Sequence, residues 1–199
     1  MLIAILLSLV AGIVLAYAGF IPPSVAALIG EAPFYCLCFM LLLVGYGVGR
    51  DKEMLRTIFS KNAAALLIPL GTVAGTLIGG AVAALILPLG LRETLAVSGG
   101  FGWYTYSAVY LAEVHSPDLG AIAFLANVGR EIFAILLIPV AVRFTGPYSA
   151  VSLCGATSMD VTLPLLTHYA GAKISVIAII HGVVLSLLTP FLIPVLIGF

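Results

Sequence analysis

Charged residues are scarce in this chain of 199 residues, where they make up only 8%, against about 25% in soluble domains. Hydrophobic residues make up 63%. This composition excludes an ordinary soluble domain and predicts an integral membrane protein whose solvent is the lipid bilayer. The eight basic and eight acidic residues give zero net charge, so the sequence offers neither a basic surface for nucleic acid nor a basic helix for the membrane surface.

Cysteine and histidine are also rare, with three of each. Cys36, Cys38 and Cys154 all lie in apolar segments, and an odd number without an extracellular framework argues against disulfides. The C-x-C spacing has no partner ligands, so we expect buried free thiols rather than a metal site. The sequence also lacks a recognisable nucleophile–base pair and a glycine-rich loop after a strand. It therefore does not support an enzyme, and no cofactor is expected.

Long apolar runs are what the sequence has in abundance. Residues 2–20 lack the basic start that a signal peptide would have, and they are about long enough to span a bilayer. We interpret them as the first membrane helix. Further apolar segments cover residues 34–49, 62–89, 94–114, 119–142, 150–170 and 174–198.

The one clearly hydrophilic loop, residues 50–61, carries four of the eight basic residues. Because Lys and Arg collect in cytoplasmic loops, we expect this loop to be inside the cell. The three helices within residues 1–93 would then form a membrane scaffold. In the third of them, Gly71, Gly75 and Gly79 provide a face on which helix backbones can approach closely.

Two of the apolar segments, 94–114 and 150–170, are interrupted by clusters of small residues. Each precedes a long uninterrupted run, 119–142 or 174–198. A shift of 55 residues aligns the two halves without a gap and places Gly100 on an equivalent glycine, which indicates an internal repeat. A matched pair of glycine-interrupted segments is a pointer to a transporter's binding site.

The two broken segments could cross the membrane or re-enter it as hairpins. If both are hairpins, Arg143 and Lys173 join the hydrophilic loop inside, whereas two crossings would leave Arg143 outside. The positive-inside rule therefore favours hairpins by a small margin, and hairpins also give the two repeats opposite topologies. The expected positions are outside for residue 92 and the C-terminus, and inside for residues 55, 146 and 172.

Two acidic residues lie where a membrane protein carries them at the greatest cost. Glu131 is near the middle of the run 119–142, and Asp160 lies inside the second broken segment. A carboxylate at the bilayer centre costs about 2.5–3.5 kcal/mol and by default marks an ion or substrate path. Asn127 and Arg130 share a helix face with Glu131. Arg130 could neutralise either acid in a structural ion pair, but one negative charge would remain for a proton, Na⁺ or a substrate amine.

The tip of the second broken segment provides a further candidate site. Exposed N–H groups around Thr157 and Ser158 could bind a substrate carboxylate, while Asp160 and Glu131 attract amines or cations. An alternative explanation for Asp160 is that an acid in the first turn of a helix is favoured by the helix dipole. The choice between these explanations is left open by the sequence.

Residues of the first tip and one buried histidine complete the candidate set. The aromatic rings could attract an amine through cation–π interaction or could anchor the chain at the membrane interface. The histidine could relay protons or form a structural hydrogen bond to a neighbouring helix. These candidates are Gly100, Gly102, Trp103, Tyr104 and His181.

Several long motifs resemble those of the LysO-type lysine exporter family. They are Ala96–Thr105 (AVSGGFGWYT), Asn127–Glu131 (NVGRE), Leu153–Pro164 (LCGATSMDVTLP) and Ile180–Gly182 (IHG). The resemblance covers essentially the whole chain and implies a multi-pass protein of the cytoplasmic (inner) membrane that exports L-lysine. It also implies that Glu131 and Asp160 are essential for transport. Familiar members carry a further helical block before the part that corresponds to Met1, so we expect a small three-helix membrane subunit to supply it or a homo-oligomer to do without it.

The fold expected from these observations is an all-α polytopic integral membrane protein. The three scaffold helices would precede a hairpin–helix–hairpin–helix transport core over residues 94–199. The expected function is export of L-lysine, and of close cationic analogues, by antiport with H⁺ or Na⁺. Two alternatives remain open: a non-transporting membrane subunit that requires a partner chain, and a cation/proton antiporter without amino-acid specificity.

Overall fold

A computed structural model describes residues 2–19 and 63–198 continuously, together with isolated residues between them. The chain divides into two compact units, Met1–Leu42 and Leu43–Phe199, and each is described by itself. In the first unit, the helix α1 covers Leu2–Tyr17, within the first expected apolar segment. All of the loop expected over 50–61 except Arg50, and most of the segment 34–49, lie outside the described residues, and so does residue 55.

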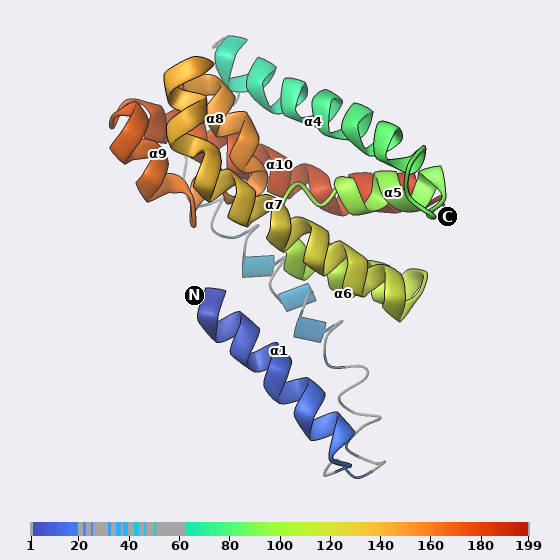
Figure 1. Cartoon of the computed structure of the whole chain (residues 1–199). Helices are drawn as coiled ribbons and strands as arrows, with labels where there is room; N and C mark the ends of the chain where they lie inside the picture. The colour runs from blue at the N-terminus through green and yellow to red at the C-terminus, as the bar shows by residue number, and fades with distance from the viewer. Residues whose placement is uncertain are drawn as a thin grey trace. The chain divides into compact units, whose positions relative to one another are not determined.

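The described part of the second unit is built from helices alone (Figure 1). Three of its helices are long and apolar enough to cross a membrane, at Leu67–Ala84, Pro117–Phe144 and Ile174–Ile197. The elements are α4 (Ala63–Ala84), α5 (Leu91–Ser98), α6 (Tyr104–Val114), α7 (Pro117–Phe144), α8 (Pro147–Cys154), the 3-10 helix η1 (Gly155–Met159), α9 (Leu163–Ala170) and α10 (Ile174–Ile197).

Local sequence signals fix both ends of the central helix α7. Ser116 precedes it, and its side-chain oxygen accepts a hydrogen bond from the N–H of Leu119 at 3.2 Å. Pro117 occupies the first helical position, where its missing N–H costs nothing. Arg143 lies in the last turn, where a cation complements the helix dipole. These signals define the bounds of α7, which is long enough to cross a membrane.

The first broken segment reverses its direction in the structure. The turn between α5 and α6 places Phe101 at φ 48° and Gly102 at φ 94°, two left-handed residues in succession. The ends of the two helices that are remote from this turn lie together, because His115 Nε2 is 3.2 Å from Glu93 Oε1. α5 and α6 therefore extend from the turn toward the same end of the unit (Figure 1).

The second broken segment also reverses. α8 ends at Gly155, whose φ of 64° stops the α-helix, and η1 then leads to α9. The outer parts of this segment pack with both long helices in one apolar cluster. Its buried members are Ala134, Ile138, Ala150, Val151, Cys154, Leu166, Ile174 and Ala178.

A shift of 55 residues carries α5, α6 and α7 close to α8, α9 and α10, respectively. The two repeats run in opposite directions. The start of α5 lies beside the end of α10, where Arg92 approaches Gly198, whereas the end of α7 packs against the start of α10 in the apolar cluster. In Figure 1 the α5–α6 pair and the α8–α9 pair accordingly extend to opposite ends of the unit.

The two tips meet at the centre of the unit. The N–H of Ala156 donates a hydrogen bond to the carbonyl oxygen of Phe101 at 2.9 Å. Gly155 packs directly on the same carbonyl, and any added Cβ would overlap it. Phe101 is fully buried and contacts Ala156 and Leu185 in a small apolar cluster. A backbone carbonyl of the first repeat and a backbone N–H of the second repeat therefore satisfy each other's hydrogen bonding.

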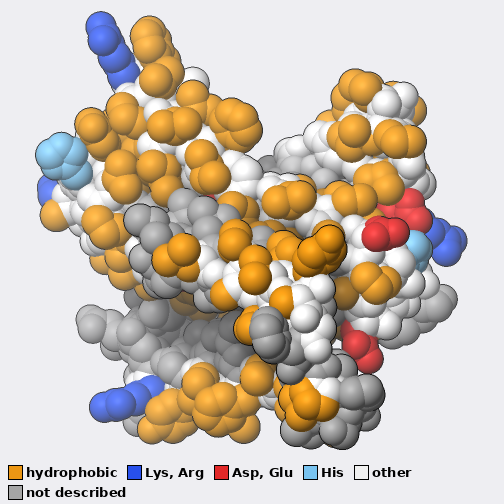
Figure 2. Space-filling view, turned by 60° about the horizontal axis from the view of Figure 1, so that its bottom comes forward, with side chains coloured by type: hydrophobic (Ala, Val, Ile, Leu, Met, Phe, Trp, Pro, Cys, Tyr) orange, Lys and Arg blue, Asp and Glu red, His pale blue; other side chains and the backbone are white. Residues whose placement is uncertain are grey.

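The outer surface of the unit is apolar. Long side chains on α7 are widely exposed, among them Leu125, Phe133 and Leu136. Hydrophobic side chains also cover much of the described surface in Figure 2, which draws the whole chain. Exposed apolar surface of this extent is expected where lipid, rather than water, is the solvent.

The contact between the tips predicts a position-specific effect of adding one methyl group. Gly155→Ala should destabilise the protein more than Gly146→Ala, by on the order of 2 kcal/mol. Both glycines have positive φ (64° and 94°), so both substitutions strain the backbone. Only Gly155 also has the Phe101 carbonyl in the place of the new Cβ, whereas nothing lies within 4 Å at Gly146. Thermal unfolding of the detergent-solubilised variants measures the difference, and equal losses would show that the tips do not constrain each other.

Candidate functional site

Two carboxylates belong to the part of the unit that contains the tips. Glu131, on α7, is 2% exposed, and its Oε2 has no hydrogen-bond partner among the described residues. Asp160 is exposed, and its Oδ1 accepts a hydrogen bond of 2.6 Å from the N–H of Val161. The two acids interact electrostatically with each other, and both interact with the hydroxyl of Tyr104. This arrangement can bind a cation, because two negative charges face a common region and neither has a cationic partner in the described part.

Asp160 lies three residues before α9 and not in its first turn. Thr162 is the residue that precedes the helix, and Asp160 closes η1 instead. The favourable interaction with a helix dipole falls off beyond the first turn. Stabilisation of α9 therefore does not explain why an acid occupies this position.

Arg130 forms no ion pair with Glu131 or Asp160, so the structural ion pair that the sequence allowed as an alternative is absent from this conformation. Its Nη1 instead donates a hydrogen bond of 3.2 Å to the hydroxyl of Thr76 on α4. An added Cβ at Gly155 would lie 3.2 Å from Nη2, so the guanidinium also reaches the second tip.

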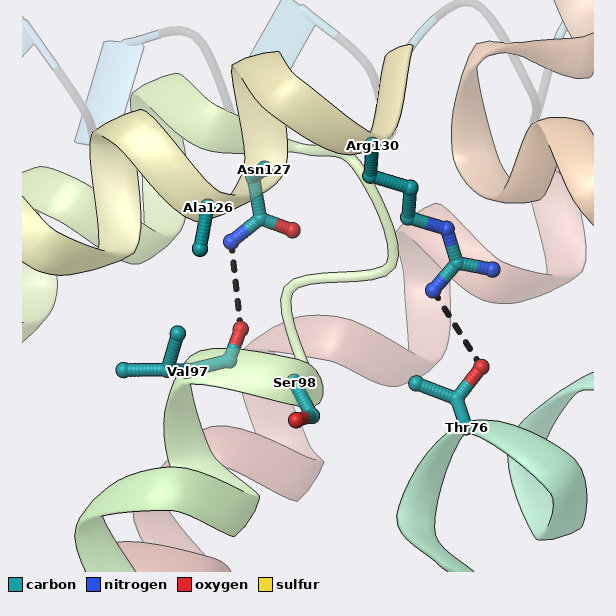
Figure 3. Close-up of a pocket in the computed structure, with 6 residues that line it drawn as sticks. All are labelled: Thr76, Val97, Ser98, Ala126, Asn127 and Arg130. Carbon is teal, nitrogen blue, oxygen red and sulfur yellow. Dashed lines mark hydrogen bonds between the residues drawn. The ribbon is translucent and has the colours of Figure 1, made fainter. Parts of the chain in front are cut away.

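The side chain of Arg130 lines a cavity of about 160 Å³ (Figure 3). Three elements form its wall: α4, the end of α5 and the middle of α7. The guanidinium crosses from α7 toward α4, and the Ser98 side chain comes from the end of α5. The residues around the cavity are Thr76, Val97, Ser98, Ala126, Asn127 and Arg130.

Asn127 holds the first tip in place. Its Oδ1 accepts a hydrogen bond from the N–H of Gly102 at 2.8 Å, and its Nδ2 donates to the carbonyl of Val97 at 3.1 Å. Nδ2 also lies 3.2 Å from the hydroxyl of Ser107 and 2.9 Å from the carbonyl of Ala123. Because these partners use its hydrogen-bonding capacity, Asn127 positions the tip in this conformation. Gly100 is required beside it, since an added Cβ would lie 2.7 Å from Nδ2.

His181 holds the second tip in place, as Asn127 holds the first. Its Nδ1 is 3.0 Å from the hydroxyl of Ser158, and its Nε2 is 2.9 Å from the hydroxyl of Thr72 on α4. The Ser158 hydroxyl also donates to the carbonyl of Ala178 at 2.8 Å, and the Thr72 hydroxyl to that of Ile68 at 3.0 Å. If both hydroxyls give their single hydrogen to the carbonyls, both ring nitrogens must donate. A neutral imidazole, however, has one donor nitrogen and one acceptor nitrogen. Beside a neutral ring, one of the two hydroxyls must therefore donate its hydrogen to the ring instead of to the carbonyl.

The remaining predicted residues also contribute to the tips. The hydroxyl of Thr157 donates to the carbonyl of Cys154 at 2.9 Å. Trp103 is half-buried and packs on Tyr106 with ring centroids 5.3 Å apart. Tyr104 is buried and makes an edge contact with Phe124 at 5.7 Å. Of these three residues, Tyr104 interacts electrostatically with the two carboxylates. Thr157 and Trp103 contact other residues of the tips instead.

Four residues with clear structural roles are missing from the sequence-based prediction: Thr72, Thr76, Phe101 and Ser107. The sequence spacing could have indicated two of them, Thr72 and Thr76. Thr72 and Thr76 are one helical turn apart in the apolar helix α4, so they share a face. Thr72 contacts His181, and Thr76 contacts Arg130. The role of Phe101 depends on its left-handed backbone, for which an aromatic residue gives no warning.

The comparisons with known proteins agree with these features. The family model described as "Lysine exporter LysO" matches residues 6–197. The chain is 41% identical over 163 residues to "Lysine exporter LysO" of Escherichia coli K12, a match that covers 82% of this chain and 54% of that protein. It is 33% identical over 158 residues to a "Putative lysine exporter" of Haemophilus influenzae Rd, with 79% and 80% of the two chains covered. No solved structure matches.

The match to the family model extends over the elements that form both tips and both long helices. The chain spans about half the length of the Escherichia coli protein and four-fifths of the Haemophilus influenzae protein. The resemblance noted from the sequence motifs is confirmed, and so is the conclusion that this is a transporter family and not an enzyme family. The chain belongs to the lysine exporter LysO family of membrane proteins.

Proposed function

We propose that this chain exports L-lysine, and close cationic analogues, across the cytoplasmic membrane by antiport with H⁺ or Na⁺. The observation that carries the proposal is the pair of carboxylates Glu131 and Asp160, which have no cationic partner among the described residues. A buried carboxylate without a counter-charge is strongly disfavoured in lipid. A bound cation removes this cost, and a substrate with two amines offers the required charge.

The fold supports transport through two re-entrant hairpins. The 3.2 Å contact between Glu93 and His115 holds the two ends of the first broken segment together, which favours a hairpin because a crossing segment would have them on opposite sides of the membrane. The antiparallel course of α7 and α10 supports an inverted repeat. Such repeats place substrate sites near the midplane, at interrupted helices. The hairpin tips, Asp160 and Glu131 would together form this site.

A partner chain or a second copy of this chain completes the transporter in our proposal. This part carries over the expectation from the family resemblance; the matches cover 54% of the Escherichia coli protein and 80% of the Haemophilus influenzae protein. The partner would be a small three-helix membrane subunit, or a homo-oligomer would form without one. The second candidate function is that of a membrane subunit that moves no lysine by itself.

Lysine flux separates these possibilities. Inverted membrane vesicles that contain the chain, with and without a candidate partner, are loaded with radiolabelled lysine under an imposed proton or sodium gradient. Lysine uptake driven by one of the gradients supports export and identifies the coupling ion. Uptake that requires the partner supports the subunit function. Sodium or proton flux that is indifferent to lysine would identify a cation/proton antiporter.

The hairpin proposal predicts which loops share a side of the membrane. In a variant without native cysteines, single cysteines at Leu91 and His115 should react from outside the cell, and those at Thr145 and Ala172 from inside. If both segments crossed, His115 would lie inside and Thr145 outside. Labelling of intact cells with a membrane-impermeant maleimide, before and after permeabilisation, distinguishes the two patterns.

The two carboxylates predict a loss of transport without a loss of folding. Glu131→Gln and Asp160→Asn should each abolish lysine uptake into inverted vesicles, because both preserve shape but remove the charge that binds the cation. Glu131→Gln should leave the amount of folded protein unchanged or increased, since a neutral amide costs less to bury than an unpaired charge.

Matched controls for these substitutions are Glu113→Gln and Asp118→Asn. Both acids are exposed near the loop between α6 and α7, and neither belongs to the site. The controls should transport lysine at the wild-type rate. Normal uptake by the Asp160→Asn variant would remove the main support for the mechanism.

A further inference from the structure

We propose that the cavity beside Arg130 binds the α-carboxylate of the transported amino acid. This inference rests on the proposed function and assigns its substrate's negative group to a site of its own. The ligand class is an amino acid whose carboxylate enters the cavity while its amines are held by Glu131 and Asp160.

The charge of Arg130 is the first step of the argument. Its guanidinium is always protonated and offers five N–H donors. One hydrogen bond accounts for part of this capacity, the bond from Nη1 to the Thr76 hydroxyl. No carboxylate of the described part lies within ion-pair distance of it. A partly buried cation without an anion is costly, and its removal from water is offset only when an anion binds.

The shape and lining of the cavity point to a small polar anion. Its volume of about 160 Å³ is below the range of roughly 300–1,000 Å³ typical of pockets that enclose a whole ligand, so it suits a head group rather than a complete substrate. Arg130 and the Thr76 hydroxyl can donate hydrogen bonds into it. The Ser98 hydroxyl instead donates its hydrogen to the carbonyl of Thr94 at 2.8 Å and offers the cavity an acceptor. The planar guanidinium also matches the geometry of a carboxylate, to which it can donate two parallel hydrogen bonds.

Several neighbouring groups are unsuited to a carboxylate. At the second tip, the N–H of Ala156 is used by the carbonyl of Phe101, and the N–H of Asp160 by the carbonyl of Thr157. A carboxylate near Glu131 or Asp160 would be repelled by two negative charges. Arg130 directly precedes Glu131 on α7. Consecutive residues of an α-helix point about 100° apart around its axis, so one helix presents a cation and an acid toward neighbouring directions. This pattern complements an amino acid, which carries an ammonium group and a carboxylate group on the same carbon atom.

Lysinamide provides a test, because it keeps the shape and the side-chain amine of lysine but has no carboxylate charge. Radiolabelled uptake into inverted vesicles is measured for both compounds with the full chain and any partner that it needs. The wild-type protein should take up lysine with the lower KM. Arg130→Gln should raise the KM for lysine by about ten- to a hundredfold, as expected from the loss of hydrogen bonds to a charged group. The KM for lysinamide should change little, so the preference for lysine should disappear.

Two further variants keep the test informative if Arg130→Gln does not fold. Arg130→Lys retains the charge but not the two-donor fork, and Thr76→Val removes the group that holds the guanidinium. Each should reduce the preference for lysine over lysinamide in part. Arg143→Gln is the matched control, since it makes the same substitution at an exposed arginine in the last turn of the same helix. It should leave both KM values unchanged.

The outcomes separate this inference from the proposed function. If the wild-type protein takes up neither compound under any gradient, lysine export is wrong and the carboxylate site falls with it. If the wild-type protein takes up lysine but Arg130→Gln affects lysine and lysinamide in parallel, only the carboxylate site is wrong. That parallel loss is also the result expected if Arg130 has a structural role or holds an inorganic anion. Wild-type protein that does not discriminate between the two compounds would equally overturn the inference.

Discussion

The contact between the two tips is the constraint on which the rest of the core depends. Irregular backbone is tolerated at membrane depth only where protein covers it or where it lines a wet cavity. Here the Ala156 N–H donates a hydrogen bond to the Phe101 carbonyl. Each repeat therefore supplies a hydrogen-bond partner to the irregular backbone of the other. Gly155 permits this approach because a side chain at that position would occupy the place of the carbonyl. Neither break would be stable in lipid alone.

Polar side chains of the core divide into two groups with different tasks. Asn127 fastens the first tip to α7, and His181 fastens the second tip to both α10 and α4 through Ser158 and Thr72. Their hydrogen bonds are directed inward, to the protein itself. Glu131, by contrast, keeps a buried oxygen without a partner in the described part. Rigid tips that are held in this way allow an unpaired charge to remain at a fixed position, which a loosely packed site could not do.

The sequence predicts the main features of this core, and its failures have physical reasons. The small residues around Gly100 and Gly155 locate both breaks, and the run 119–142 falls within α7. The sequence left open whether Arg130 forms an ion pair, because helical spacing states which residues share a face but not which atoms they reach on another helix. The partner turned out to be Thr76 on α4. Likewise, His181 and Asn127 are recognisable as buried polar residues, but only the structure shows that their hydrogen bonds are used by the tips.

Under the proposed mechanism, coupling to an ion follows from the electrostatics of the empty site. When lysine leaves, Glu131 and Asp160 lose the amines that balanced them, and Arg130 loses the carboxylate. The arginine can retain the Thr76 hydroxyl as a weak substitute, but Glu131 Oε2 has no such substitute among the described residues. The return of the empty core through a closed state would therefore bury an uncompensated negative charge, at a cost of several kcal/mol. A proton or Na⁺ bound to the carboxylates removes this cost. Exchange of lysine for a cation is in this sense a consequence of leaving the acids unpaired, and it needs no separate device in the fold.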